Sequence, residues 1–188
     1  MQFDPKTHLE ENEIYLEKPE PSFGLANEMF QVVDKNREHV LPWLEWGATN
    51  KTKTPEDSFM FMVRADQKWK ENKGFEYLIH LKETKEIIGG IGASHTDSER
   101  SHKIEIGYWL AKPFCGKGYM QKAVRLIEKE FSALGVIRFV IRNDVENIPS
   151  AKTAKALGYH FEGIARKDKW NNYLKSYRDM NVWSKIME

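Results

Sequence analysis

A short loop containing Gly116 and Gly118 is the part of this 188-residue sequence whose residue types and spacing point most directly to chemistry. Glycine has no Cβ, so the backbone there can turn sharply and a ligand can come close to its N–H groups. The apolar periodicity of 119–134 predicts a helix that begins directly after the loop. N–H groups at a helix N-terminus lack intrahelical partners and favour negative charge, so residues 116–120 are predicted to cradle a pyrophosphate.

Two well-known phosphate-binding signatures do not fit this loop. The NTPase P-loop requires Lys followed by Ser or Thr after its last glycine, where this chain has Tyr119 and Met120. The dinucleotide fingerprint requires a third glycine where Gln121 stands. A nucleotide-binding module that uses the same loop in another way remains an alternative.

The segments around the loop predict a βαβ unit. Residues 103–110 alternate as a strand, with Ile104 and Ile106 on one face and Glu105, Gly107 and Trp109 on the other. After the helix, Gly135 is predicted to be a left-handed cap, and the apolar run 136–142 to be a buried strand. Such a crossover is expected to be right-handed.

The remaining segments predict a single α/β domain that spans 1–188, with a mixed sheet and helices on both faces. Residues 1–12 are expected to be loose. Strands are predicted at 14–17, 75–82, 86–94, 160–170 and 176–187, and helices at 25–35, 37–44, 55–69 and 148–157.

The loop Cys115-Gly-Lys-Gly-Tyr-Met120 resembles motif A of the GNAT acetyltransferase superfamily, which holds the pyrophosphate of acetyl-CoA with Gln/Arg-x-x-Gly-x-Gly/Ala. It matches at Gly118 and departs at Cys115 and Met120. Segments before and after the loop are similar to the RimJ/RimL-type branch, the ribosomal-protein N-terminal acetyltransferases, and they extend the resemblance over nearly the whole chain. They are Asn36–Trp46, Glu105–Leu110, Asn147–Ser150, Leu157–Gly163 and Tyr177–Trp183.

This resemblance implies a GNAT fold, in which a mostly antiparallel sheet contains two central parallel strands that splay apart around the pantetheine arm of acetyl-CoA. By carry-over, Ser150 contacts the arm and protonates the departing thiolate, and Asn147 contacts the arm. The alternative is that Asn147 is an ordinary helix N-cap, Ser150 lies in the first turn, and the glycines only shape a tight connection. The remaining implied cofactor-binding residues are Trp109, Leu110 and Ala111 on the strand and Cys115, Gly116, Lys117, Gly118, Tyr119 and Met120 in the loop.

The implied reaction needs a free amine, so a group that removes its proton is expected. An α-amine is roughly 10–15% neutral at pH 7, whereas a lysine amine is only about 0.04% neutral, so an N-terminal acceptor asks less of a base. Glu105 is the best-placed carboxylate, acting directly or through one water, although it could be a solvated strand residue. Asp168 is a weaker candidate, and His95 and His102 are expected to lie in an exposed polar loop.

Cys115 stands where the family has Gln or Arg. A helix N-terminus can lower the pKa of a thiol, which would make Cys115 reactive or able to form a mixed disulfide with CoA. The favoured expectation is instead a buried, inert cysteine.

Two further clusters have two interpretations each. Trp43 and Trp46 are core residues or one wall of the acceptor groove. The glycines of 89–92 indicate a bulge or the close approach of acetyl-CoA or a packing helix to the strand.

Composition limits the function classes. The net charge of +1 gives no basic stripe of the kind that binds nucleic acid. The sequence has no run of 18 apolar residues and no signal-peptide pattern. We therefore expect a cytoplasmic location and no membrane association. A single cysteine excludes an internal disulfide, and no cluster has metal-ligand spacing, so no metal is expected.

The sequence therefore predicts an N-acetyltransferase that moves acetyl from acetyl-CoA to an amine in a ternary complex. The expected acceptor is the N-terminus of a ribosomal or other protein. Alternatives are a small amine, such as a polyamine, an aminoglycoside or an amino acid, and a catalytically silent acyl-CoA-binding protein. Rim-type relatives are often dimers, so a homodimer also stays open.

Overall fold

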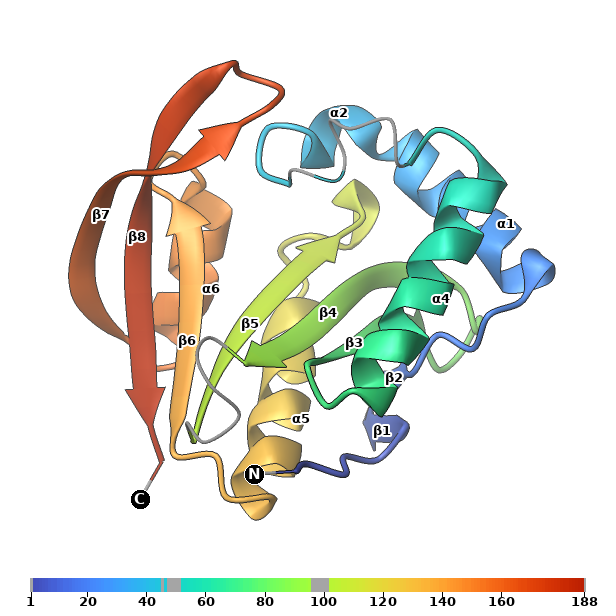
Figure 1. Cartoon of the computed structure of the whole chain (residues 1–188), viewed down its shortest axis with the longest axis horizontal. Helices are drawn as coiled ribbons and strands as arrows, with labels where there is room; N and C mark the ends of the chain where they lie inside the picture. Colours follow the sequence, from blue (N-terminus) through green and yellow to red (C-terminus); the bar gives the residue numbers. More distant parts are fainter. Residues whose placement is uncertain (1, 45, 47–51, 96–101, 188) are drawn as a thin grey trace.

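A single eight-stranded sheet forms the centre of the computed structural model, which describes residues 2–44, 46, 52–95 and 102–187. Its order is β1-β2-β3-β4-β5-β6-β8-β7 (Figure 1), and every neighbouring pair is antiparallel except β5 with β6. The predicted mixed, mostly antiparallel sheet is confirmed. Its strands are β1 His8–Glu11, β2 Ile14–Glu17, β3 Gly74–Leu81, β4 Ile87–His95, β5 Lys103–Leu110, β6 Arg138–Asp144, β7 His160–Asn171 and β8 Ser176–Ile186.

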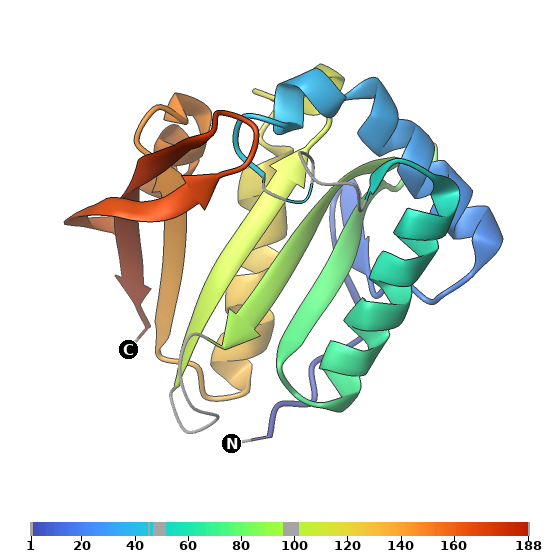
Figure 2. The ribbon, with the colours of Figure 1, turned by 45° about the horizontal axis from the view of Figure 1, so that its top comes forward.

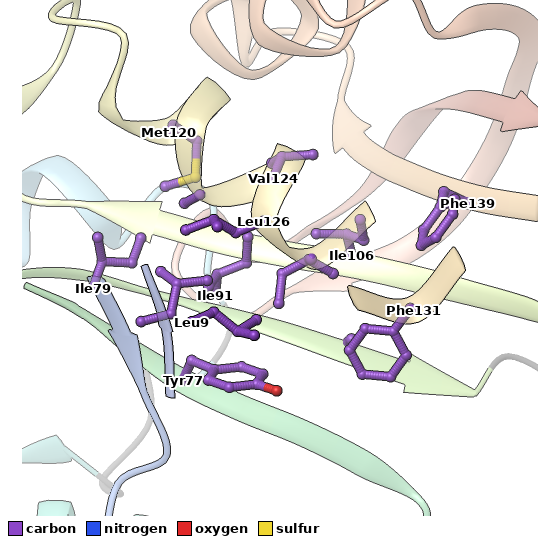
Figure 3. Packing of buried hydrophobic residues seen from close by; sticks show 14 of the residues in the cluster. Leu9, Tyr77, Ile79, Ile91, Ile106, Met120, Val124, Leu126, Phe131 and Phe139 are labelled. Atoms are coloured by element: carbon purple, nitrogen blue, oxygen red, sulfur yellow. The ribbon is translucent and has the colours of Figure 1, made fainter. Parts of the chain in front are cut away.

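Helices cover both faces of this sheet, as predicted (Figures 1 and 2). On one face, Met29 and Val33 of α1 pack with Met62 of α4 against Leu78 and Ile87 of the strands. On the other face, α5 packs against the middle strands (Figure 3). The helices are α1 Phe23–Lys35, α2 Arg37–Val40, α4 Pro55–Lys70, α5 Tyr119–Ala133 and α6 Ile148–Ala156.

Helix α5 has the bounds that its periodicity predicted, to within one residue. Met120, Val124, Ile127 and Phe131 recur at four- and three-residue steps and are all buried. Full burial of one such side chain is worth about 1.5–3 kcal/mol, so this face fixes the helix on the sheet. Gly135 follows with φ +92°, the left-handed conformation predicted for it.

Three local predictions were wrong. The segment expected to be loose contains β1, because Leu9 is buried in the core and the strand pairs with β2. Helix α2 ends at Val40 rather than at Leu44. Strand β6 begins at Arg138, two residues late, because the N–H groups of residues 137 and 138 both donate to the His102 carbonyl oxygen.

Strands β5 and β6 stay together for only three residue pairs, the last being Glu105 with Val140. Beyond that pair β5 continues to Leu110 alongside β4, and β6 continues to Asp144 alongside β8. The two parallel strands therefore diverge toward their C-terminal ends (Figure 1). This opening in the middle of the sheet is the splay that the resemblance implied, and it positions the site described next.

Candidate functional site

The opening exposes one edge of β5. The Ala111 N–H donates to Ile88 O of β4 at 2.8 Å, and backbone groups alternate in direction along a strand. Ala111 and Trp109 therefore direct their amides toward β4, whereas Tyr108 and Leu110 direct theirs toward the opening. Of the three strand residues predicted to pair with a pantetheine arm, only Leu110 faces the opening. Tyr108 was missed, although its place on the same alternating face as Leu110 would have identified it.

The glycine loop lies between the end of β5 and α5, after the short 3₁₀ turn Lys112–Phe114. Gly116 and Gly118 have φ of +77° and +83°, and a Cβ at either position would meet no atom within 4 Å. The left-handed backbone thus favours glycine, and the space above it is open. Gly118 is the N-cap of α5 and makes no side-chain capping hydrogen bond.

These features fit an anion. The first-turn N–H groups of α5 have no side-chain cap, and the N-terminal dipole of a 15-residue helix lies at the same place. Met120 and Tyr119 offer only backbone N–H groups here, because Met120 is buried in the core and Tyr119 packs against it. Lys117 is exposed, with its Nζ 5.6 Å from the centre of the Phe114 ring.

The loop is held from the other side by the junction of α1 and α2. The Lys112 N–H donates to Asn36 Oδ1 at 2.8 Å, and Cys115 Sγ lies 3.5 Å from His39 Nε2. Cys115 is exposed, so the expectation of a buried cysteine was wrong. The protein around Sγ nevertheless shields it enough to raise the pKa of the Cys115 thiol, the opposite of the shift expected at a helix N-terminus. The thiol is therefore mostly protonated near neutral pH.

Glu105 lies where β5 and β6 part, and it lines a cavity of about 690 Å³ on the α1 and α4 side of the sheet. Burial raises the pKa of the Glu105 carboxyl, and the charges of Arg142, Lys169 and Lys103 oppose part of that rise. A carboxyl shifted in this way is a stronger base than an ordinary glutamate when it is ionised. Position, accessibility and pKa thus all suit a general base. The remaining lining residues are Ser94, His95, Lys103, Gly107, Arg138, Val140, Arg142, Glu162 and Val182.

The wall of this cavity formed by β6, β7 and β8 contains two arginines, each paired with a carboxylate, beside Val140 and Val182. Arg138 contacts both carboxylate oxygens of Glu162 at 2.7 Å, and Arg142 forms a salt bridge with Asp168. Asp168 comes from an irregular part of β7, where the register with β8 shifts between residues 165 and 169. Because Arg142 binds it, the Asp168 carboxylate is less available as a base than that of Glu105.

Across the opening, the N-terminus of α6 faces β5. Asn147 is its N-cap, and its Oδ1 accepts from the Ser150 N–H at 3.2 Å. Ser150 Oγ lies 3.0 Å from the Tyr108 hydroxyl, which reaches across from β5. Burial raises the pKa of Tyr108 to about 12, so this hydroxyl keeps its proton at neutral pH. The capping role of Asn147 is therefore observed, and its predicted contact with a cofactor stays a prediction.

The tryptophans and histidines lie in different surroundings. Trp46 packs edge-to-face on Trp109, with ring centres 5.7 Å apart, as part of the α1 and α4 core. Trp43 lines a small second cavity near Trp170 of the β7–β8 hairpin. His95 belongs to β4, stacks on Phe3 and is partly buried, so its expected place in an exposed loop was wrong. Residues 96–101 of the predicted loop lie outside the described residues.

The glycines of β4 accommodate side chains and backbone of this chain. A Cβ at Gly90 would lie 2.6 Å from Trp109 Nε1, and a Cβ at Gly92 would lie 2.3 Å from Glu76 Oε2. The groups that approach Gly90 and Gly92 are therefore side chains of the neighbouring strands, and not a cofactor or a helix. The expected bulge is present, because the register of β3 with β4 shifts between Ile79 and His80.

Within the described ranges, no three His, Cys, Asp or Glu side chains are grouped so that they could hold a metal ion. Over the same ranges, no helix has the length and apolar character that a membrane crossing requires.

A sequence profile of the acetyltransferase (GNAT) domain matches residues 14–160 of the chain. The uncharacterised N-acetyltransferase p20 of Bacillus licheniformis is 36% identical over 97 residues, which are 51% of this chain and 54% of p20. The chain thus aligns with only about half the length of that relative. The ribosomal-protein-serine acetyltransferase of Escherichia coli K12 is 24% identical over 166 residues, 85% of this chain and 86% of that protein.

Among solved structures, the microcin C7 self-immunity acetyltransferase MccE, in complex with acetyl-CoA and AMP, superposes with a TM-score of 0.85. The two sequences are 28% identical, and the superposition covers 94% of each chain.

Proposed function

The chain belongs to the acetyltransferase (GNAT) family, and from this premise we propose that it transfers acetyl from acetyl-CoA to the N-terminal α-amine of a protein or peptide. The observation that carries the proposal is the position of Glu105, an accessible carboxyl with a raised pKa at the point where β5 and β6 separate. Transfer is direct, within one ternary complex, and relies mainly on positioning.

The co-substrate supplies an activated thioester carbonyl. This chain holds its pyrophosphate with the N–H groups of residues 116–120 at the N-terminus of α5. The Tyr108 and Leu110 N–H groups face the opening and are donors for a carbonyl oxygen that lies there. None of these groups needs to change conformation to serve as a donor.

Glu105 accepts the proton of the incoming ammonium group. An α-ammonium has a reference pKa of about 7.7–8.0, against about 10.4 for lysine, so the gap between the pKa of the ammonium group and that of Glu105 is about 2.5 units smaller for an α-amine. The raised glutamate pKa narrows both gaps equally. The charges of Arg142, Lys169 and Lys103 favour the ionised carboxylate and oppose part of the rise in its pKa. This match is why we favour an N-terminal acceptor over a lysine side chain.

Ser150 and Tyr108 supply a proton at the other side of the opening. The Tyr108 hydroxyl keeps its proton and lies 3.0 Å from Ser150 Oγ, so it can donate to Ser150 while Ser150 donates to the departing sulfur. The serine therefore does not end as an alkoxide, and the proton that Tyr108 gives up is restored from water before the next turnover.

Ser150→Ala is expected to lower kcat by about 10²-fold, the low end of the effect of a positioned proton donor, and to leave KM for the acceptor unchanged, because the loss falls on the departure of the thiolate. Tyr108→Phe is expected to cause a smaller decrease, since the serine hydroxyl remains. Steady-state kinetics on both variants measure this. Equal kcat values for the Ser150 variant and wild type would contradict the assigned role. Ser176→Ala, at the start of β8 and outside the cavity lining, is the control for the substitution.

The acceptor class is supported by the E. coli relative, whose name describes a ribosomal-protein-serine acetyltransferase. We place the reaction in the cytoplasm, where the N-termini of ribosomal proteins are made. The second candidate is a small amine, which MccE supports because it was crystallised with AMP as well as acetyl-CoA.

The test is to incubate the protein with acetyl-CoA and a mixed panel of N-terminal peptides, polyamines and aminoglycosides, and to identify products by mass. Mass detection avoids thiol reagents, with which Cys115 could react. Acetylated peptides are the expected product. Acetylated small amines without acetylated peptides would favour the second candidate, and CoA binding without any product would favour a silent binder.

A further inference from the structure

Gly107 occupies an unusual place in the middle of the sheet. It lies in β5, a central strand, yet it is exposed and lines the 690 Å³ cavity. On this face of the strand its neighbours are Glu105 and Trp109. Since pairing of β5 with β6 ends at Glu105, Gly107 is the next residue on this face beyond the point where the strands part.

Nothing in the described chain requires glycine at this position. Its φ lies outside the left-handed region, and a Cβ added to it would meet no atom within 4 Å. Glycine in the interior of a strand weakens the strand, so a side chain would be expected here for stability alone. The stability of the fold therefore does not explain why residue 107 is a glycine.

The glycines of the neighbouring strand β4 are different. Added Cβ atoms at Gly89, Gly90 and Gly92 would lie 2.4 Å, 2.6 Å and 2.3 Å from atoms of Trp109 or Glu76. Gly92 is directly opposite Gly107 in the register. At the β4 glycines, atoms of Trp109 and Glu76 fill the space that a side chain would need. At Gly107 that space is part of the cavity.

We propose that Gly107 is a specificity-determining residue, and that the room above it takes the side chain of the acceptor's first residue while the α-amine lies at Glu105. In an extended strand, residues 105 and 107 lie two positions apart on one face, about 7 Å. That spacing suits an amine and the side chain on the neighbouring Cα. The inference rests on the proposed function, because it assumes a peptide acceptor.

The test compares wild type, Gly107→Ala and Gly107→Val on peptides that start with Gly, Ser, Leu or Phe and are otherwise identical. Wild type is expected to accept all four. In Gly107→Val, kcat/KM for the Leu and Phe peptides is expected to fall by about 10- to 100-fold relative to the Gly peptide, since one or two methyl groups in a pocket discriminate by about that factor. Gly107→Ala should be intermediate.

Gly24→Val is the matched control, because Gly24 is exposed, has no atom within 4 Å of an added Cβ, and lies outside the cavity lining. It should leave the order of peptides unchanged. The thermal unfolding midpoint and the CoA affinity of Gly107→Val are measured as well. A midpoint at or above that of wild type, with unchanged CoA affinity, would show that a selective loss of kcat/KM does not come from misfolding.

The outcomes separate the two levels of the proposal. If wild type acetylates no peptide, the proposed function fails and this inference falls with it. If wild type acetylates peptides, then a loss that is equal for all four, or no loss, overturns the role of Gly107. Rejection of the Leu and Phe peptides by wild type would also overturn it. A Gly107→Val variant that prefers propionyl-CoA or acetyl-CoA differently from wild type, while its preference among the four peptides is unchanged, would overturn it too.

Discussion

Glu105→Gln is expected to lower kcat/KM for a peptide acceptor by about 10²–10³-fold near neutral pH, because a positioned general base contributes about 10²–10⁴-fold. The affinity for acetyl-CoA should stay the same, since the glycine loop and α5 are untouched. The amide has nearly the shape of the carboxylate but cannot accept a proton. The change therefore isolates proton removal from packing in the cavity.

The effect of Glu105→Gln on kcat should depend on pH in a definite direction. Glu105 acts only when it is deprotonated, so a raised pKa moves the rise of wild-type kcat to higher pH than an ordinary glutamate would give. As pH falls through that pKa, wild-type Glu105 becomes protonated and resembles the glutamine of the variant. The ratio of wild-type to variant kcat should therefore shrink toward acid pH.

The control for this variant is Glu83→Gln, which makes the same chemical change in the exposed turn between β3 and β4. It should behave as wild type at every pH. A ratio of wild-type to Glu105→Gln kcat that does not vary with pH would mean that the carboxylate acts by position or charge and not as a base.

Gly118→Val is expected to weaken acetyl-CoA binding by about 10- to 100-fold, because a hydrogen bond to a charged group contributes about 1.5–3 kcal/mol. At φ +83° a β-branched residue is strained, so the loop must move and the N–H groups at the start of α5 lose their arrangement. The measurement is the dissociation constant for CoA by calorimetry, which does not depend on catalysis.

Gly158→Val provides the matched control, since Gly158 follows the C-terminal end of α6, has φ +80° and also has no atom within 4 Å of an added Cβ. Both variants should lose stability from the same backbone strain, of about 1–2 kcal/mol. Only Gly118→Val should lose affinity for CoA. Equal CoA affinities for the two variants would remove the glycine loop from the cofactor site.

Local sequence patterns predicted the parts of the fold that local physics determines. The periodicity of 119–134 defined α5, and the alternation of 103–110 placed Glu105 and Trp109 on one face of β5. The positive φ of Gly118 and Gly135 follows from residue type and helix ends, which can be read without tertiary contacts. The splay of β5 from β6 was implied by the family resemblance, because no local pattern tells two strands where to part.

Features that depend on distant contacts were not predictable in this way. Cys115 owes its surroundings to His39, 76 residues earlier, so neither its exposure nor the direction of its pKa shift follows from the loop sequence. The strand alternation could have placed Tyr108 at the opening, but its hydroxyl contact with Ser150, 42 residues later, could not be predicted from the strand alone. Likewise, the glycines of β4 are explained by side-chain and backbone atoms of β3 and β5 that the sequence does not show to be adjacent.

The central claim is that an α-amine receives the acetyl group. The most direct measurement uses one peptide that carries a free N-terminus and an internal lysine, with fragmentation in the mass spectrometer to locate the added acetyl group. Acetyl on the N-terminal residue, with the lysine unmodified and the product lost in Glu105→Gln, is the result that we predict. Acetyl on the lysine, with the N-terminus free, would contradict the account.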